Sequence, residues 1–471
     1  MGLASIIRAL GAGIFFLGIA MGIPGLFSLS GVSQTITSDT GTGTSIWFFA
    51  LLVTTLTGGG LFLASGTLRP PTDFRGGILL VLLWWMIAPV FAALPIYLGG
   101  VGFSDAYFEA VSAITTTGAW LSLESLLNDP VHLLWRAILQ WSGGLVSIAF
   151  AASIIVRPAF YGVETLQLPF SRGEQDSYLR SLRNALRSFL SIYGLLTVAC
   201  FGILAISGIE TFDAVILSFS VPASGGLIPH IDGMAGYPPW LGSVLMPFIL
   251  FSGINFILLS TIIRGSWRNL QDNETEVFVI MIFAVGILFW VLAGAGDIDL
   301  IPAQLFNSVS LLTTNGMILG EAPPLTVAVI TSLIGGAAVS TAGGFKIQRW
   351  LVIMARAREE IRRLILPNAV HGQTKIANEL GVWMHFLVFT LVLAIMILVM
   401  TFSGHNFDEA ASVATATLSN TGPLIGLSGL ENSDYGVFST PTRWFMVIAM
   451  ILGRIEAVAA LALFNRAFWR S

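Results

Sequence analysis

Apolar stretches long enough to cross a lipid bilayer run through almost the whole of this 471-residue chain. A membrane-spanning helix needs about 20 apolar residues, and the sequence supplies about ten such stretches. Charged residues make up only 10% of the chain, against about 25% in an average soluble domain. The sequence therefore predicts an all-α integral membrane protein. The stretches lie near residues 5–30, 46–66, 76–99, 133–156, 188–208, 241–263, 275–294, 324–355, 381–403 and 442–465.

Basic residues mark one side of the membrane, because they cluster in alternate connections between the apolar stretches. These residues are Arg69, Arg75, Arg157, Arg172, Arg180, Arg183, Arg187, Arg264, Arg268, Arg356, Arg358, Arg362, Arg363 and Lys375. Cytoplasmic connections carry the excess of Lys and Arg, so we expect these connections and both termini to be cytoplasmic. Arg136 and Arg443 lie toward the outer side, each beside a Trp, where we expect them to anchor helix ends at the interface.

Four polar segments on the outer side repeat one pattern. Each begins near an acid, continues as a short helix and ends at a glycine turn, and apolar stretches precede and follow it. Non-helical backbone at membrane depth occurs only where it lines a water-filled cavity or is buried in protein. We therefore expect four re-entrant pore helices in four pseudo-symmetric repeats around one pore. The segments are DAYFEAVSAITTTGAW (105–120), ETFDAVILSFSVPASGGLIP (210–229), DIDLIPAQLFNSVSLLTTNGMI (297–318) and FDEAASVATATLSNTGPLIG (407–426).

These repeats divide the chain into five predicted parts. An N-terminal helix pair (1–70) precedes pore repeat 1 (71–160), pore repeat 2 (161–265), pore repeat 3 (266–360) and pore repeat 4 (361–471). An acid near the start of a short helix can cap free N–H groups and complement the positive end of the helix dipole. The partially negative helix ends would then face the pore axis and stabilise a cation. The acids expected to do this are Asp105, Asp213, Asp299 and Asp408.

The glycine turns carry the chemistry expected of a potassium pathway. Backbone carbonyls can replace the hydration shell of a potassium ion, and glycine allows the positive φ that aims successive carbonyls at one axis. Gly118, Gly226, Gly316 and Gly422 occupy the matching position in the four turns. We predict an ion-binding selectivity filter made of Thr116, Thr117, Gly118, Ser224, Gly225, Gly226, Thr314, Asn315, Gly316, Asn420, Thr421 and Gly422.

Further motifs accompany these turns, namely QWSGGL (140–145), SGINF (252–256), STAGGFK (340–346) and GRIE (453–456). Together with TTTG, SGG, TTNG and SNTGP, they resemble the signature of the TrkH/KtrB/HKT superfamily of potassium and sodium translocating proteins. The extra N-terminal helix pair resembles the TrkH branch. In that superfamily a serine in place of the first filter glycine accompanies sodium preference. Gly118 is present, so the resemblance implies potassium permeation.

The resemblance also implies partners and a location. It implies channel-like potassium uptake across a bacterial inner membrane, by a homodimer with one pore in each subunit. A TrkA-like cytosolic regulatory subunit, which binds nucleotide itself, would dock on the basic connections at 157–187 and 356–380. Attraction of the same arginines to anionic membrane lipid is the competing explanation.

A run of small residues, GGAAVSTAGG (335–344), interrupts the long stretch from Leu325 to Arg356. We expect it to break the helix, and the resemblance implies an intramembrane loop that obstructs the path below the filter. A close helix crossing through small residues is the alternative. The predicted gate residues are Gly335, Gly336, Ser340, Thr341, Gly343, Gly344 and Arg454.

Arg454 lies midway along the last apolar stretch, where a charged residue is a candidate for function. It would help to close the pore or form an electrostatic barrier below the ion sites. The alternative is a structural ion pair with an acid such as Glu456.

Other classes of function fit less well. A secondary transporter coupled to a proton or sodium ion is the main alternative, but its expected signature is inverted repeats with intramembrane carboxylates, whereas these four units run in one orientation. The chain has no metal-ligand spacing of the HExxH kind and no phosphate-binding loop motif, so we expect neither an enzyme, nor a cofactor, nor a nucleic-acid partner. A single cysteine, Cys200, excludes an internal disulfide.

Overall fold

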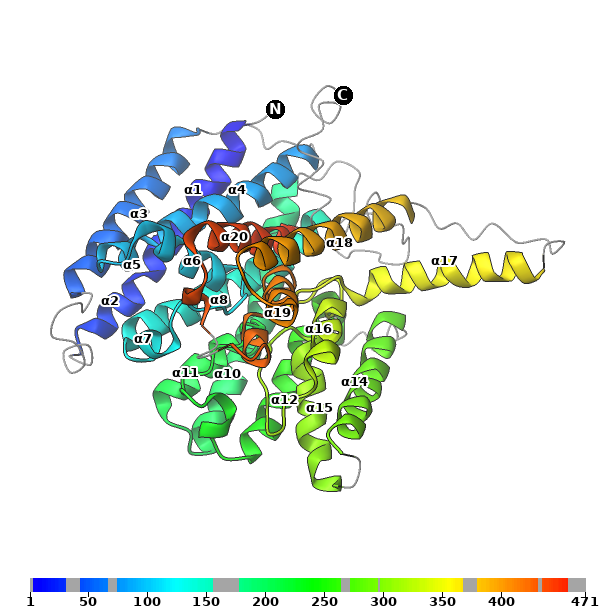
Figure 1. Cartoon of the computed structure of the whole chain (residues 1–471). Helices are drawn as coiled ribbons and strands as arrows, with labels where there is room; N and C mark the ends of the chain where they lie inside the picture. Colours follow the sequence, from blue (N-terminus) through cyan, green and yellow to red (C-terminus); the bar gives the residue numbers. More distant parts are fainter. Residues whose placement is uncertain are drawn as a thin grey trace.

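The computed structural model describes residues 3–30, 43–66, 74–155, 178–263, 272–294, 297–366, 379–430 and 434–455. Over these ranges the chain is helical and contains no strand (Figure 1). The helices are α1 (Leu3–Ala20), α2 (Gly22–Ser28), α3 (Thr44–Ala64), α4 (Phe74–Ala92), α5 (Leu94–Leu98), α6 (Phe103–Ile114), α7 (Leu123–Leu127), α8 (Pro130–Phe150), α10 (Tyr178–Ile206), α11 (Thr211–Ser220), α12 (Trp240–Gly253), α13 (Phe256–Ile263), α14 (Asn273–Leu292), α15 (Ile301–Leu312), α16 (Leu325–Ile334), α17 (Ile347–Ile365), α18 (Glu379–Phe402), α19 (Phe407–Leu418) and α20 (Thr440–Ile455).

Seven helical stretches of the described chain are long and apolar enough to cross a membrane. Each coincides with one of the predicted stretches, which confirms an all-α protein with several membrane-spanning helices. An eighth candidate, α12 with α13, passes only as a pair bent by 104°. The seven are Leu3–Ser28, Thr44–Ala64, Gly76–Leu98, Pro130–Ser153, Leu179–Ile206, Asn273–Leu292 and Leu380–Phe402.

The bend between α12 and α13 divides the apolar stretch predicted at 241–263 into two helices. Asn255 starts a new helix there, because its side-chain oxygen accepts the backbone N–H of Ile257 at 3.0 Å. The N–H of Phe256 donates to the carbonyl of Val339, at 2.8 Å, instead of to its own helix. A distant part of the chain therefore takes over a bond that a continuous helix would make.

The stretch predicted at 324–355 is also divided, because α16 ends at Ile334 and α17 begins at Ile347. Gly335 and Gly344 have φ values of 76° and 74°, which only glycine adopts without strain. The chain then returns on itself, since the N–H of Phe345 donates to the carbonyl of Leu333 at 2.9 Å. We call residues 335–346 the glycine-rich loop.

The N-terminal helices form a flank beside the rest of the chain (Figure 1). Glycines let α1 and α3 approach closely: a Cβ added at Gly58 would collide with the backbone of Phe15, and one at Gly11 would lie 2.7 Å from the backbone nitrogen of Phe62. Small residues at a helix crossing are a common basis of helix association in a bilayer. The hydrophobic effect does not drive helices together inside lipid, so close packing does so instead. On the opposite flank α17 projects away from the bundle (Figure 1).

Candidate functional site

The short helices α6, α11, α15 and α19 all end in the same backbone turn. In each, an N–H bonds back to the carbonyl five residues earlier: Thr117 to Ser112, Gly225 to Ser220, Asn315 to Ser310 and Thr421 to Ala416, at 2.9, 3.0, 2.9 and 2.8 Å. This is the bond of a helix end that closes through a left-handed residue. We call the four ends the first (115–119), second (223–227), third (313–317) and fourth (419–423) glycine turns.

The left-handed residue in each turn is not glycine. Thr116, Ser224, Thr314 and Asn420 have φ values of 55°, 53°, 58° and 55°. A side chain in this region costs about 1–2 kcal/mol, and such strain persists where the surroundings over-determine it, as at ligand sites. Gly118, Gly226 and Gly316, each two residues later, also have positive φ, whereas Gly422 does not and instead precedes Pro423 in a short 3-10 turn.

The four turns form a closed ring. A Cβ added at Gly118 would run into the carbonyl oxygen of Gly225 in the second turn, and one added at Gly226 would run into the carbonyl of Asn315 in the third. Gly316 faces Thr421 and Pro423 of the fourth turn. The fourth turn closes the ring on the first, because the N–H of Gly422 donates to the carbonyl of Thr117 at 2.5 Å. Each predicted filter residue therefore lies in one ring of four buried turns, and turns one and three lie opposite each other.

The glycine-rich loop packs against three of these turns. The carbonyl of Thr341 accepts from the Ser224 hydroxyl at 2.8 Å, and the Thr341 hydroxyl donates to the carbonyl of Pro222 at 3.0 Å. The N–H of Gly343 donates to the Thr314 hydroxyl at 2.7 Å, and a side chain at Gly343 would collide with the carbonyl of Ser419. The loop thus touches the second, third and fourth turns, and its contact at Gly343 leaves no room for a side chain.

Arg454, near the described end of α20, contacts the remaining turn. Its Nε donates to the carbonyl of Thr115 at 2.5 Å, and a terminal nitrogen donates to the Thr116 hydroxyl. The other terminal nitrogen donates to the carbonyl of Thr341 in the loop at 2.7 Å. Among the described residues its hydrogen-bond partners are all neutral oxygens, and Glu456 lies outside the described residues. The structure thus joins the first turn to the glycine-rich loop through one buried guanidinium.

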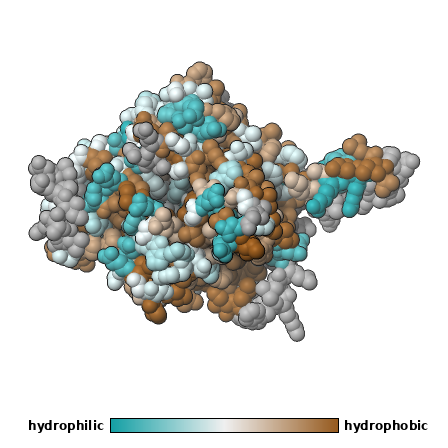
Figure 2. Space-filling view, turned by 60° about the horizontal axis from the view of Figure 1, so that its bottom comes forward, coloured by the Kyte–Doolittle hydropathy of each residue, from teal (hydrophilic) through white to brown (hydrophobic). Residues whose placement is uncertain are grey.

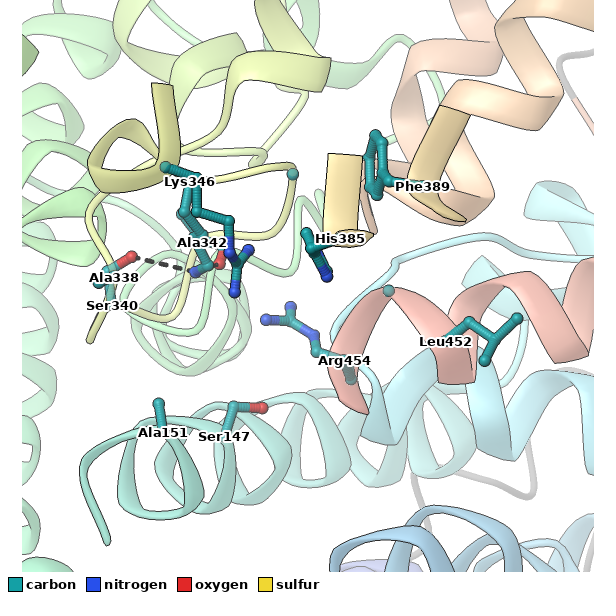
Figure 3. Close-up of a pocket in the computed structure, with 13 residues that line it drawn as sticks. Ser147, Ala151, Ala338, Ser340, Ala342, Lys346, His385, Phe389, Leu452 and Arg454 are labelled. Atoms are coloured by element: carbon teal, nitrogen blue, oxygen red, sulfur yellow. Dashed lines mark hydrogen bonds between the residues drawn. The ribbon is translucent and has the colours of Figure 1, made fainter. Parts of the chain in front are cut away.

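A small pocket lies beside Arg454 and the loop. Figure 3 shows His385 of α18 and Arg454 of α20 directing their nitrogen atoms into the space beside the loop. Lys346 donates from its ammonium group to the carbonyl of Ala342. The described lining has several basic groups and no carboxylate, which makes it unfavourable to a cation. Its residues are Ser147, Ala151, Ala338, Ser340, Ala342, Gly344, Lys346, Arg349, His385, Phe389, Leu452, Gly453 and Arg454.

Two of the predicted capping aspartates, Asp105 and Asp213, do not cap their short helices through their side chains. Asp105 lies in the first turn of α6 and pairs with Arg443 at 3.1 Å. Asp213 accepts from the Tyr237 hydroxyl at 2.6 Å. The cap prediction is therefore wrong for these two, because nearby donors on other elements compete for the carboxylates, although their place in the first turn still suits the helix dipole.

The prediction for Arg136 is also wrong. It is 1% exposed and forms an ion pair with Glu109 of α6, itself 7% exposed. The guanidinium also donates to the Ser112 hydroxyl at 3.1 Å and to the carbonyl of Ala119. Its sequence position at the start of an apolar stretch suggested the interface, but a partner on a neighbouring helix lets the charge be buried.

A family model described as TrkH, a cation transport protein, matches residues 85–470 of this chain. The chain belongs to the TrkH family. Being a member of a family of transport proteins, it is a transport protein rather than an enzyme.

Individual relatives of the TrkH family agree with this assignment. The Trk system potassium uptake protein TrkH of Escherichia coli strain K12 is 30% identical over 426 residues, covering 84% of this chain and 86% of that protein. TrkH of Halomonas elongata is 28% identical over 496 residues and covers 100% of both. The crystal structure of the potassium transporter TrkH from Vibrio parahaemolyticus superposes with a TM-score of 0.85 at 26% identity and covers 100% of both chains.

Some residues that shape this TrkH-family site were not predicted to do so. Gln140, in the QWSGGL motif, donates from its side chain to the carbonyl of Gly225 at 3.0 Å and so ties α8 to the second turn. Glu274 of α14 accepts the N–H of Ala338 at 2.6 Å and so holds the glycine-rich loop. A polar residue inside or beside an apolar stretch was the available signal, because such residues are buried only with partners.

Proposed function

We propose that this chain takes up potassium ions across the bacterial inner membrane through a pathway lined by backbone carbonyls of the four glycine turns. The observation that carries the proposal is the closed ring, in which each turn contacts the next. A ring of carbonyls can replace the water around a dehydrated potassium ion. The potassium uptake named for the curated relatives supports the choice of ion.

The backbone of the turns suits this role. Alternate residues in the first three turns, such as Thr116 and Gly118, have positive φ, which rotates successive peptide groups toward one side. The four short helices end at the ring, so the partially negative ends of their dipoles add to the field of the carbonyls. We assign the ion sites to the twelve residues predicted as the filter, in four pore repeats with re-entrant helices.

Passage below the ring is proposed to be gated. The glycine-rich loop contacts the second, third and fourth turns and Arg454 contacts the first, so together they lie across one end of the ring. A guanidinium stays charged and repels cations, and the hydroxyl and carbonyl bonds of Thr341 keep the loop in place. Opening of the pathway requires the loop to break these hydrogen bonds. We describe uptake controlled by such a gate as channel-like.

Partners and orientation follow from the same proposal. We propose a homodimer, both termini in the cytoplasm and a TrkA-like cytosolic regulatory subunit. The projecting α17 supports a partner, because Figure 2 shows hydrophilic and hydrophobic residues on different sides of it. Leu364 and Ile365 are 84% and 69% exposed, whereas Arg356 and Arg363 form ion pairs along the helix.

Flux in proteoliposomes tests the proposed function. We expect purified protein to carry rubidium, as a potassium substitute, down its gradient and much faster than sodium. Flux that requires a proton or sodium gradient would favour a coupled transporter, and equal rubidium and sodium flux would refute the proposed filter.

A further inference from the structure

Two of the four glycine turns are followed by a backbone N–H that bonds a carboxylate or amide side chain of the preceding short helix. In the first turn the N–H of Leu121, three residues after Gly118, donates to the Glu109 carboxylate at 2.6 Å. In the third turn the N–H of Leu319, three residues after Gly316, donates to the Asn307 side-chain oxygen at 2.8 Å. Glu109 and Asn307 each lie nine residues before their glycine, so the same bond recurs at equivalent positions.

The equivalent residues of the other two repeats cannot make this bond. Leu217 and Val413 lie nine residues before Gly226 and Gly422. Both are fully buried and apolar. Because turns one and three lie opposite each other in the ring, this bond occurs on one diagonal, and the equivalent positions on the other diagonal are apolar.

The support of the first turn is ionic. Arg136 donates to Glu109, to the Ser112 hydroxyl and to the carbonyl of Ala119. The Ser112 hydroxyl donates to the same carbonyl of Ala119 at 2.6 Å. The carbonyl after Gly118 is thereby held toward the protein behind the turn, which ends the row of carbonyls available to an ion in this repeat.

The support of the third turn uses neutral amides. The Asn307 amide nitrogen donates to the carbonyls of Leu319 and Glu321 at 3.1 and 3.2 Å, and the Gln304 amide nitrogen donates to Glu321 at 3.0 Å. Asn307 and Gln304 are both 0% exposed. Asn307 thus holds the chain that leaves the third turn, as Glu109 and Arg136 hold the chain that leaves the first turn.

We propose that Glu109, Arg136 and Asn307 are positioning residues for ion selectivity, which fix the outer opening of the pathway across one diagonal of the ring. This rests on the proposed function of the turns. A filter selects ions by holding its oxygens at defined positions, and a buried polar network with several hydrogen bonds resists displacement. The second and fourth turns have other supports, since Gln140 donates to the carbonyl of Gly225 and the Tyr435 hydroxyl donates to the carbonyl of Gly422.

Matched substitutions test the inference in the full-length protein. Glu109→Gln keeps an oxygen for the N–H of Leu121 but removes the charge that faces Arg136, and Asn307→Leu installs the residue type found in the second repeat. The control is Glu409→Gln on α19, because that carboxylate bonds His405 and Asn406 at the outer end of the helix. The readouts are the ratio of rubidium to sodium flux in proteoliposomes and the melting temperature.

We expect Glu109→Gln, which removes the ion pair with Arg136, and Asn307→Leu, which removes the hydrogen bond to Leu319, each to lower the flux ratio about tenfold. Glu409→Gln should leave the ratio unchanged. If Glu109→Gln does not fold, the double variant Glu109→Gln with Arg136→Met removes the unpaired buried charge and carries the same expectation.

Folded variants with a lower melting temperature and a wild-type flux ratio would show a purely structural role and overturn the inference. Gly118→Ala in the same assay separates this from failure of the proposed function. A changed ratio for Gly118→Ala alone would refute only the positioning residues, whereas wild-type ratios for all variants would refute the filter itself.

Discussion

Replacing Gly118 or Gly316 by alanine separates two possible contributions to ion selectivity, namely packing between neighbouring turns and backbone conformation. Both glycines have a φ of 75°, so alanine at either position carries the same penalty of about 1–2 kcal/mol. Their surroundings differ. A Cβ at Gly118 would overlap the backbone carbonyl of Gly225, whereas a Cβ at Gly316 meets Thr421 Cγ2 at 3.1 Å and Pro423 Cβ at 3.2 Å.

The expected size of the effect follows from what has to move. At Gly118 the carbonyl of Gly225 must retreat by most of an ångström, and it also accepts from Gln140 at 3.0 Å. Breaking that buried bond costs about 1–3 kcal/mol. At Gly316 the neighbouring side chains give way by a few tenths of an ångström. We expect Gly118→Ala to lower the rubidium to sodium flux ratio by about tenfold, and Gly316→Ala by less than about threefold.

The assay is paired rubidium and sodium flux in proteoliposomes, with melting temperatures measured on the same preparations. Both variants should lose similar stability from the shared φ, and only Gly118→Ala should lose most of its selectivity. Equal effects of the two variants would refute the argument from turn-to-turn packing. If only Gly316→Ala lost selectivity, the neighbours assigned to Gly118 and Gly316 in the ring would be wrong.

Three further predictions concern the gate. Arg454→Gln should raise cation flux with selectivity retained and reduce stability by about 1–3 kcal/mol for the lost hydrogen bonds. The control Arg443→Gln, on the same helix but paired with Asp105, should not raise cation flux. Unchanged flux in folded Arg454→Gln would exclude an electrostatic barrier. Gly343→Ala should also raise flux, because its methyl group would collide with Ser419 and push the loop away; lower flux with the loop still in place would contradict this. Deletion within 335–344 should raise basal flux most of all, and a folded deletion protein with wild-type flux would favour a helix-packing role.

The sequence predicted the class of fold and the places of the turns because both leave a one-dimensional signal. Apolar length marks the spans, and a short polar segment that ends at a glycine marks each turn, at Gly118, Gly226, Gly316 and Gly422. The break before Ile347 also had a local cause, a run of small residues. Each of these features follows from residues that are neighbours in the chain.

Other features depend on pairs of distant residues, and no local pattern could predict them. The bend after Gly253 is stabilised in part from a distance, because Val339 of the glycine-rich loop accepts the N–H of Phe256. The burial of Arg136 needs Glu109, 27 residues earlier. In both cases the sequence showed a polar or flexible residue in an apolar stretch, but its partner was set by tertiary packing.

The glycine-rich loop and Arg454 together contact all four turns. The loop reaches the second, third and fourth turns, whereas the first turn bonds Arg454 of α20 instead. Thr341 accepts from Arg454 and from Ser224 through one carbonyl oxygen. Any movement of the loop that frees Thr341 therefore loosens the contacts of Arg454 and of the second turn together, which links opening of the proposed gate to the ring itself.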